Sequence, residues 1–531
     1  MGKKPHSRNG AGQSAKGSFS QVAKAPSASV ALAKSEPGGS PKQDLLTMEE
    51  AIDQLKTTRP SFYRWLREGK IKGFKIGRQW RFERQDIERF LQGLGPRIDL
   101  PVSPAPLVRQ LEAKLAAVGK RVEAGRFPDD PVADAVYLMI ALAYHQRASD
   151  IHITPQYESG AWSAVMRTRI DGVLHVQAQA DIRLLPALME RWKSLAAMSG
   201  LDKNMPQDGR MTVMVEGTEA DLRTSILPAQ GGEALTVRLL LRLQDLLTFD
   251  LNKFGFDPAD LKRIIEAVHA PHGVIVCNGP SGSGKTTTLY ACLSMLAGPE
   301  IKTLSVEDPV EYILPWVTQV SANFQVGLGF ARAVRAFLRS DPDVIMVGEI
   351  RDLEVLETCI QAAMTGHLVM TQLHATDSAS ALRRMVEIGC KPFMVSDGVR
   401  LVISQRLIRR LCTKCSKPVT LSAEEEAMVA EGAVSGGLAL ATLPREFRQP
   451  VGCPECAGTG YRGRAVVAET LKISGAIAKA LRDEANVDDL RRLAISEGMT
   501  TMRADGIRKA AHGFTSLREV QWVCGAVWEG K

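Results

Sequence analysis

A run of eight residues at positions 279–286, Gly-Pro-Ser-Gly-Ser-Gly-Lys-Thr, constrains the fold of this 531-residue chain more than any other feature. The apolar stretch 273–278 precedes it, and a segment with apolar residues at helical spacing follows it. This order predicts a strand, a tight loop and a helix. Glycines let the backbone N–H groups of such a loop converge on phosphate oxygens, and the helix N-terminus adds a favourable dipole. The sequence therefore predicts a phosphate-binding loop in an α/β domain.

The side chains of this run indicate what it binds. Lys285 is expected to reach the β- and γ-phosphates of a nucleoside triphosphate, and the Thr286 hydroxyl is expected to ligate Mg²⁺. ATP and Mg²⁺ are therefore the predicted cofactors. The predicted nucleotide-binding residues are Gly279, Pro280, Ser281, Gly282, Ser283, Gly284, Lys285, Thr286 and Thr287.

Apolar runs alternate with helical segments between about residues 246 and 405, which predicts a buried parallel sheet flanked by helices. The runs are 273–278, 303–306, 344–348 and 368–373. Glu307 follows the second run and Glu349 follows the third. Because open α/β sheets bind ligands at the carboxyl ends of their strands, both carboxylates are candidates for the chemistry of hydrolysis.

Three segments of this domain resemble those of the ATPases that drive type II secretion and type IV pilus assembly. Residues 304–311, Leu-Ser-Val-Glu-Asp-Pro-Val-Glu, are similar to the acidic box of that family. Residues 339–352 are similar to its Walker B region, and residues 365–374 to its histidine box. The resemblance covers about residues 130–531. It implies a RecA-like core, ATP hydrolysis, a homo-oligomer (a hexamer), an inner-membrane platform protein as partner, and a cytoplasmic location at the inner membrane.

The resemblance also implies roles for single residues. Glu349 takes the place of the usual Walker B aspartate and is expected to serve the magnesium and the attacking water, while Glu307 is a candidate general base; which of the two is the base stays open. His367 and His374 are expected to sense the γ-phosphate end of the pocket. The chain departs from the family at two positions that usually hold threonine, Gln372 and Ala375.

Residues 131–245 are predicted to form an α+β domain that precedes the motor. Helices are expected around 132–147 and 184–199, and strands at 161–168, 211–215 and 235–241. Segments 206–210 and 221–223 resemble parts of the domain that precedes the motor in this family. Phosphoryl transfer gains from arginines supplied across an interface, so the resemblance makes Arg210 and Arg223 candidates to reach bound ATP. Salt bridges between strands are the alternative for each of them. Weaker candidates of the same kind are Arg167, Arg169 and Arg238.

Two C-x-x-C pairs, Cys412 with Cys415 and Cys453 with Cys456, predict a zinc site in the C-terminal region, residues 406–531, which is expected to be helical around a cysteine-bearing loop. A redox pair would need only one such motif. Four cysteines leave no open coordination position, so the predicted role of Zn²⁺ is structural. In the resembled family this motif marks the assembly and export ATPases.

The N-terminal end is basic. Residues 1–43 carry seven Lys or Arg against one acid and are predicted to be a disordered leader. Residues 44–93 resemble an excisionase-type winged helix-turn-helix module, with a capping-box pattern at Thr47 to Glu50, and residues 94–130 are read as a linker and a helix. The module could contact DNA through basic side chains or serve as a docking adaptor for a partner protein, and we favour docking.

Composition narrows the function classes. No apolar stretch reaches the roughly 18–20 residues that a membrane span needs, and the basic N-terminus lacks the apolar core of a signal peptide. A chain of 531 residues is too long for one core, so several domains are expected. The function predicted from these features is a cytoplasmic ATP-driven motor for protein export or pilus assembly. The alternatives are a DNA-uptake or conjugation motor and a DNA-binding regulator switched by its ATPase.

Overall fold

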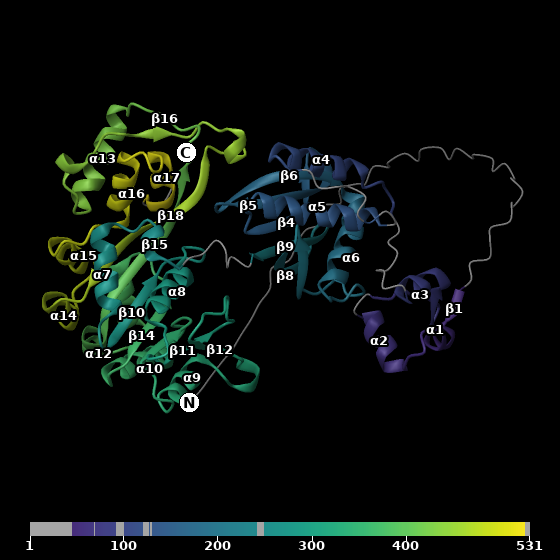
Figure 1. Cartoon of the computed structure of the whole chain (residues 1–531), viewed down its shortest axis with the longest axis horizontal. Helices are drawn as coiled ribbons and strands as arrows, with labels where there is room; N and C mark the ends of the chain where they lie inside the picture. Colours follow the sequence, from purple (N-terminus) through teal and green to yellow (C-terminus); the bar gives the residue numbers. More distant parts are fainter. Residues whose placement is uncertain are drawn as a thin grey trace, which may run out of the picture.

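The computed structural model of the protein describes residues 45–67, 70–91, 100–120, 127, 130–241 and 249–525. The leader predicted at 1–43 lies outside these residues, as do positions 92–93 of the predicted module and positions 94–99 of the predicted linker. The described residues form a small N-terminal module, an α+β domain and a larger α/β domain (Figure 1). The last of these contains the phosphate-binding run.

The N-terminal module packs short helices on a three-stranded antiparallel sheet, with strand order β1-β3-β2. The predicted capping box is confirmed, since Glu50 N donates to Thr47 Oγ1 and Thr47 N donates to the Glu50 carboxylate. Its elements are β1 (Leu45–Thr47), α1 (Met48–Gln54), α2 (Arg59–Arg67), β2 (Phe74–Ile76), β3 (Gln79–Glu83) and α3 (Arg84–Leu91).

The α+β domain is a six-stranded antiparallel sheet, in the order β6-β5-β4-β9-β8-β7, whose helices share one hydrophobic core with it. The elements are α4 (Ala105–Ala117), α5 (Pro131–His145), β4 (Asp150–Glu158), β5 (Ala161–Ile170), β6 (Val173–Asp181), α6 (Leu185–Leu195), β7 (Gln207–Val215), β8 (Thr218–Ala229) and β9 (Gly232–Leu241). The sequence patterns missed β4, β6 and β8. These strands bury only part of their residues, so their apolar signal is weak.

The α/β domain is built on a seven-stranded sheet in the order β12-β11-β13-β14-β10-β15-β18, in which all neighbours except β15 and β18 run parallel. Separate apolar cores cover its two faces, as expected for a parallel sheet between helices. The elements up to β15 are α7 (Pro258–Val268), β10 (Gly273–Asn278), α8 (Lys285–Leu296), β11 (Thr303–Glu307), β12 (Val317–Ser321), α9 (Phe330–Phe337), β13 (Val344–Val347), α10 (Leu353–Met364), β14 (Leu368–Leu373), α11 (Ser378–Glu387), α12 (Pro392–Gly398) and β15 (Val399–Leu411).

The sequence patterns had predicted a C-terminal region that is helical around a cysteine-bearing loop. In the structure this region also contains strands. The expected boundary at 405/406 falls inside β15, and β18 (Tyr461–Lys472) returns to pair with β15 in the same sheet. The pairing joins segments about fifty residues apart in the chain, so no local pattern reveals it. The other elements are β16 (Lys417–Pro418), α13 (Ala423–Ser435), β17 (Arg448–Gln449), α14 (Gly475–Arg482), α15 (Val487–Ser496), α16 (Met502–Ala511) and α17 (Leu517–Cys524).

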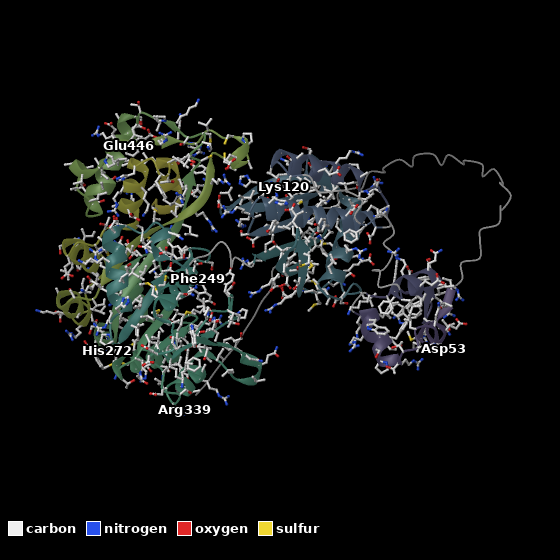
Figure 2. The ribbon with its side chains drawn as sticks, viewed as in Figure 1. Asp53, Lys120, Phe249, His272, Arg339 and Glu446 are labelled. Atoms are coloured by element: carbon white, nitrogen blue, oxygen red, sulfur yellow. The ribbon has the colours of Figure 1, made fainter. Side chains whose placement is uncertain are left out.

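Polar contacts join the α+β domain to the α/β domain. Asp171, in the turn between β5 and β6, accepts a 2.9 Å hydrogen bond from Gly463 N at the start of β18. Arg223 of β8 lies 3.7 Å from the carboxylate of Glu311. Next to Glu311, an aromatic cluster packs the beginning of the α/β domain, since the Phe249 ring (labelled in Figure 2) lies 5.7 Å from that of Tyr290.

In the part of the chain that the structure describes, no helix combines the length and the apolar character that crossing a membrane requires.

Candidate nucleotide site and four-cysteine centre

The loop 279–284 joins β10 to α8 and has a backbone that only glycine tolerates at several points. Gly279, Gly282 and Gly284 have φ angles of +145°, +77° and +87°. A Cβ at Gly279 would lie 2.5 Å from the carbonyl oxygen of Gln405, which leaves no room for a side chain. A loop of this kind lets backbone N–H groups surround a phosphate at the start of a helix. Its geometry fits the triphosphate that the sequence predicted.

Lys285 and Thr286 form the first turn of α8. The Lys285 side chain is buried, and its Nζ donates to the carbonyl oxygens of Gly279 and Pro280 at 2.9 and 3.0 Å. Burial lowers the pKa of Lys285 below its ordinary value. The Thr286 hydroxyl accepts a 3.1 Å hydrogen bond from the side chain of Gln372. The lysine cation in the glycine loop can neutralise the phosphates of ATP, and the neighbouring threonine hydroxyl can ligate Mg²⁺. The two side chains together therefore suit Mg²⁺-ATP.

Glu349 lies at the same carboxyl edge of the sheet, just beyond the end of β13. Its Oε2 lies 3.3 Å from His374 Nε2, and its Oε1 accepts a 2.5 Å hydrogen bond from Arg351 Nε. Burial alone would raise the pKa of Glu349, but the hydrogen bonds and charges of Arg351 and His374 outweigh it and hold the pKa below its ordinary value. The carboxylate therefore stays ionised at neutral pH, as a metal-binding or water-binding group requires.

Arg351 fixes this corner of the site. Its guanidinium also donates to Asp308 at 3.0 Å. It lies 5.3 Å from the ring centroids of both Phe324 and Phe330. Sequence reasoning gave Arg351 no role, although the residue stands two positions after Glu349 in the segment that resembles Walker B. The arrangement holds the Glu349 carboxylate beside Asp308 and His374.

Glu307, at the end of β11, has a different environment. Its side chain is buried and accepts hydrogen bonds from the Tyr290 hydroxyl, from Ser305 Oγ at 2.7 Å and from Gln319 Nε2 at 3.1 Å. These donors occupy the carboxylate from several sides. The expectation that Glu307 is a general base does not fit this geometry, because its lone pairs are already engaged. The sequence pattern locates the strand end but does not show which side chains pack over it.

The histidines of the 365–374 segment lie at opposite ends of β14. His374 follows the strand and touches Glu349. His367 precedes the strand, and its carbonyl oxygen accepts from Gly273 N, the first residue of β10, at the amino edge of the sheet. A six-residue strand spans about 20 Å, so His367 does not lie at the γ-phosphate end within its own chain. The prediction for His367 needs this correction.

Four of the five candidate arginines form one row across the sheet of the α+β domain, and Arg167 lies outside the row, opposite His152. The register pairs Arg210 with Arg223, Arg223 with Arg238, and both Arg238 and Arg169 with Asp150. Residues that face each other across a ladder share a face of the sheet. Arg238 and Arg169 form ion pairs with Asp150 at 3.2 and 3.5 Å, which matches the salt-bridge alternative for these two. Arg210 is exposed on the same face, beside a cavity of about 460 Å³ lined by Arg210, Arg223 and Arg238.

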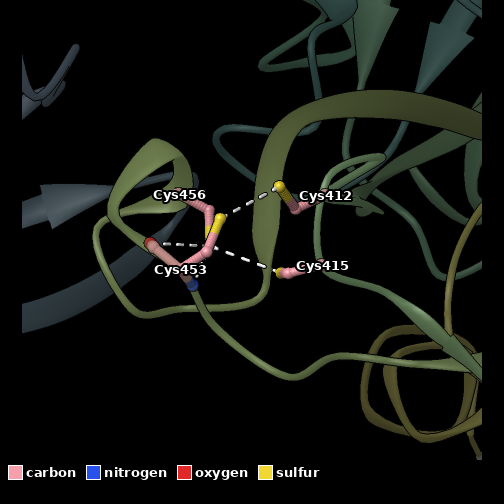
Figure 3. Close-up of side chains that lie close together, drawn as sticks. All are labelled: Cys412, Cys415, Cys453 and Cys456. Carbon is pink, nitrogen blue, oxygen red and sulfur yellow. Dashed lines mark hydrogen bonds between the residues drawn. The ribbon is translucent and has the colours of Figure 1, made fainter.

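The four predicted metal ligands come together from two separate loops. The Sγ atoms of Cys412, Cys415, Cys453 and Cys456 all lie within 4.8 Å of one another (Figure 3). Three of the separations are 3.7, 3.8 and 3.9 Å. A tetrahedral site with Zn–S bonds of about 2.3 Å has sulfur–sulfur edges of about 3.8 Å. The cluster therefore fits Zn²⁺.

Backbone N–H groups support the thiolates that such a site needs. Gly452 N donates to Cys415 Sγ at 3.3 Å, and Cys453 N and Gly460 N each donate to Cys456 Sγ at 3.2 Å. Burial alone would raise the pKa of Cys456, but these two amides, together with the hydrogen bonds to the thiols of Cys453 and Cys415, lower it to about 7. The backbone hydrogen bond with Cys456 would lower the pKa of Cys453, but burial and hydrogen bonding among the same four thiols raise it to about 12. The thiolate is the form that binds metal, and Cys456 is the cysteine that reaches this form near neutral pH.

The comparisons with known proteins decide the family. The family described as Type II/IV secretion system protein matches residues 127–522. The chain belongs to this family. It is 37% identical over 439 residues to the type IV pilus assembly ATPase PilB of Myxococcus xanthus, an alignment that covers 82% of this chain and 75% of the relative. It is 39% identical over 392 residues to the type II secretion system protein E of Aeromonas hydrophila, with coverage of 74% and 75%. The family predicted from the sequence motifs is thus confirmed.

Members of the family are ATPases, so the predicted enzyme class and the cofactors ATP and Mg²⁺ are supported as well. The X-ray structure of the Legionella pneumophila ATPase DotB superposes with a TM-score of 0.51 at 20% identity, covering 73% of this chain and 94% of DotB. This likeness confirms the α/β fold class. A second family, described as a helix-turn-helix domain, matches residues 45–95, as predicted for the N-terminal module.

Sequence reasoning also missed a residue that supports the phosphate loop from β15. The buried Gln405 donates from Nε2 to the carbonyl oxygen of Ser283 at 2.8 Å and accepts from Thr288 Oγ1 at 2.9 Å. No local motif marks it, because its role depends on β15 lying beside β10. Gln405 ties the loop to the neighbouring strand.

Proposed function

We propose that this ATPase is a motor that works at the cytoplasmic face of the inner membrane and drives pilus or pseudopilus assembly or protein export through a platform protein. The observation that carries the catalytic part is that Thr286 and Glu349 lie at the same carboxyl edge of the sheet. Gln372 links them, because its side chain donates to the Thr286 hydroxyl and its carbonyl accepts from Ile350 N. The names of the relatives, an assembly ATPase and a secretion protein, support the transport part.

Each residue at this edge has a chemical task in the proposal. Lys285 would neutralise the β- and γ-phosphates of bound ATP, and Thr286 would ligate Mg²⁺. Glu349 positions the attacking water and accepts its proton, because its carboxylate is ionised and only partly buried. His374, in contact with Glu349, lies where it can respond to the γ-phosphate. Bound Mg²⁺ would supply charge stabilisation for phosphoryl transfer.

The arginine row supplies the rest of the site in the assembled motor. Arg210 and Arg223 present positive charge on the face of the sheet from which Arg223 contacts Glu311 of the α/β domain. We propose that these two arginines reach ATP when the α+β domain swings against the motor of the same or a neighbouring copy in a hexameric ring. Binding and release of ATP would then rotate one domain against the other and transmit force.

The N-terminal module is proposed to be a docking adaptor. Its exposed side chains include the apolar Phe74 and Ile76, 39% and 55% exposed, which share one face of the edge strand β2. The basic Lys75 lies on the opposite face of the strand, over the Trp80 ring. An exposed apolar pair on a sheet edge suits a partner protein better than a phosphate backbone, which offers no apolar contact. Duplex DNA is the alternative partner.

Purified full-length protein tests the motor proposal. ATPase activity should rise when a cytoplasmic fragment of the inner-membrane platform protein is added and should not respond to duplex DNA. Lys285→Ala serves as the inactive control in both assays, since it removes the fixed cation. Stimulation by DNA and not by the platform fragment would replace export or pilus assembly by a DNA-uptake or conjugation role.

A further inference from the structure

Gln372 links two parts of the nucleotide site that are far apart in the chain. It is the fifth residue of β14, next to Cys277 of β10 in the sheet. Its side-chain Nε2 donates to Thr286 Oγ1 at 3.1 Å. Its backbone carbonyl accepts from Ile350 N at 2.9 Å, one residue after Glu349. Gln372 therefore connects the magnesium-binding hydroxyl to the segment that carries the catalytic glutamate.

The Thr286 hydroxyl needs an acceptor when it binds a metal. A hydroxyl that ligates Mg²⁺ through an oxygen lone pair must direct its proton elsewhere. P-loop enzymes commonly place a Walker B aspartate at this point. Here the residue directly after β13 is Gly348, which has no side chain, and the carboxylate of Glu349 is already engaged by Arg351 and His374. Among the described residues, the side chain that forms a hydrogen bond with the Thr286 hydroxyl is that of Gln372.

An amide carries a donor and an acceptor on the same carbon, so a half-turn of the Gln372 amide replaces Nε2 by Oε1 opposite Thr286. A threonine, which the sequence analysis noted as usual at this position, is two bonds shorter and cannot reach as far. The length and the acceptor of glutamine are both needed for the contact.

We propose that Gln372 positions the Thr286 hydroxyl for Mg²⁺: its amide oxygen accepts the hydroxyl proton and turns a lone pair of Oγ1 toward the metal. This inference rests on the proposed role of Thr286 and goes beyond it, because it makes metal affinity depend on a side chain outside the phosphate loop. Gln372 is a positioning residue in this proposal, since it acts through Thr286.

The experiment measures metal-dependent nucleotide binding by the full-length protein. A fluorescent ATP analogue is titrated in EDTA and then at rising Mg²⁺, for the wild type, Gln372→Met and Gln372→Glu. Methionine keeps the length and removes the acceptor, and glutamate keeps the acceptor. Gln361→Met, on the exposed surface of α10, is the matched control.

We expect Gln372→Met to bind the analogue like the wild type in EDTA but to need on the order of 10–100-fold more Mg²⁺ to reach the Mg²⁺-dependent signal, as is typical when a partner of a metal ligand is lost. Gln372→Glu should need no more Mg²⁺ than the wild type, and Gln361→Met should match the wild type. The wild type must itself show a Mg²⁺-dependent signal; its absence would count against the proposed Mg²⁺-ATP site and not against Gln372 alone.

Three outcomes would overturn the inference. An unchanged Mg²⁺ requirement in Gln372→Met would show that Thr286 finds its acceptor elsewhere. Equal weakening in EDTA and in Mg²⁺ would make Gln372 a packing residue of the loop. A Gln372→Glu variant as impaired as Gln372→Met would remove the role of the acceptor oxygen.

Discussion

The ends of β11 and β13 look alike in sequence and differ in what surrounds them. The strands are parallel neighbours, paired from Thr303 with Val344 to Val306 with Val347. Each has a glutamate at its carboxyl end: Glu307 is the last residue of β11, and Glu349 lies two residues after the end of β13. In the folded protein Glu307 is 3% exposed and receives donors from three side chains, whereas the side chain of Glu349 is 27% exposed and faces His374 and Arg351.

This difference teaches how a carboxylate is assigned to structure or to chemistry. A general base must have a lone pair that water can reach. The hydroxyls of Tyr290 and Ser305 and the amide of Gln319 fill the lone pairs of Glu307 from within the protein. Arg351 and His374 engage Glu349 from the solvent-accessible edge where the phosphate loop also lies. Catalysis is thus expected at the end of β13, and stabilisation at the end of β11.

The sharpest way to break this comparison is to neutralise Glu349. Glu349→Gln should lower the turnover number by about two to four decades, because an amide cannot accept the proton of the attacking water. Binding of ATP should persist, since Lys285 and the glycine loop are unchanged. Steady-state ATPase kinetics with a parallel nucleotide-binding titration measure both. Near-normal turnover would return the base to Glu307.

The four-cysteine centre extends the comparison, because its side chains, like that of Glu307, are engaged within the protein. Cys412→Ser with Cys415→Ser should remove about one zinc ion per chain in elemental analysis and lower the melting temperature, since zinc binding contributes directly to the folding free energy. Nucleotide affinity should change much less than stability. The centre lies beyond the end of the β15–β18 pair at Leu411, whereas the phosphate loop contacts β15 at Gln405. An unchanged melting temperature after zinc loss would refute the structural role.

Glu307→Gln tests the other half of the comparison. The amide brings an N–H₂ group against the donors from Tyr290, Ser305 and Gln319, and an unsatisfied buried donor costs about 1–3 kcal/mol. We expect a lower melting temperature with turnover close to that of the wild type. Glu349→Gln is the matched control, with the opposite pattern. A loss of turnover in Glu307→Gln without loss of stability would contradict the assignment.

Asp260 is a third carboxylate, and it is buried like Glu307. Burial, opposed by the hydrogen bond from Thr470, raises the pKa of Asp260 to about 6. An acid with a raised pKa binds its proton more tightly in the folded state, so its stabilisation is present below the unfolded value of 3.8 and is lost as pH rises through about 6.

The corresponding variant is Asp260→Asn, which cannot ionise. The difference in the free energy of unfolding between Asp260→Asn and the wild type, measured by denaturant titration, should shift in favour of the variant as pH rises from about 4 to 7, by up to about 3 kcal/mol for a pKa shift of this size. A difference that does not depend on pH would mean that Arg263, 3.0 Å away, keeps Asp260 ionised in the folded protein.

The sequence located the chemistry more reliably than it located the architecture. Strands 273–278 and 368–373 were predicted with the bounds that the structure shows, because buried parallel strands are continuous apolar runs. The β15–β18 pair was missed and the half-buried strands of the α+β domain were found only in part. Pairing between distant segments depends on tertiary contacts that leave no periodic signal of their own.

By itself the sequence determined the phosphate loop, the four cysteines and the family, because each is written in residues that are close together and chemically specific: glycines where a positive φ is needed, thiols where a soft metal is bound. Only the tertiary structure decided that Glu349 is open and Glu307 closed, that His374 and not His367 shares an edge with Thr286, and that Gln372 reaches that hydroxyl. The physical reason is that accessibility, hydrogen-bond saturation and position along a strand are set by what packs from other segments, and a local motif does not encode them.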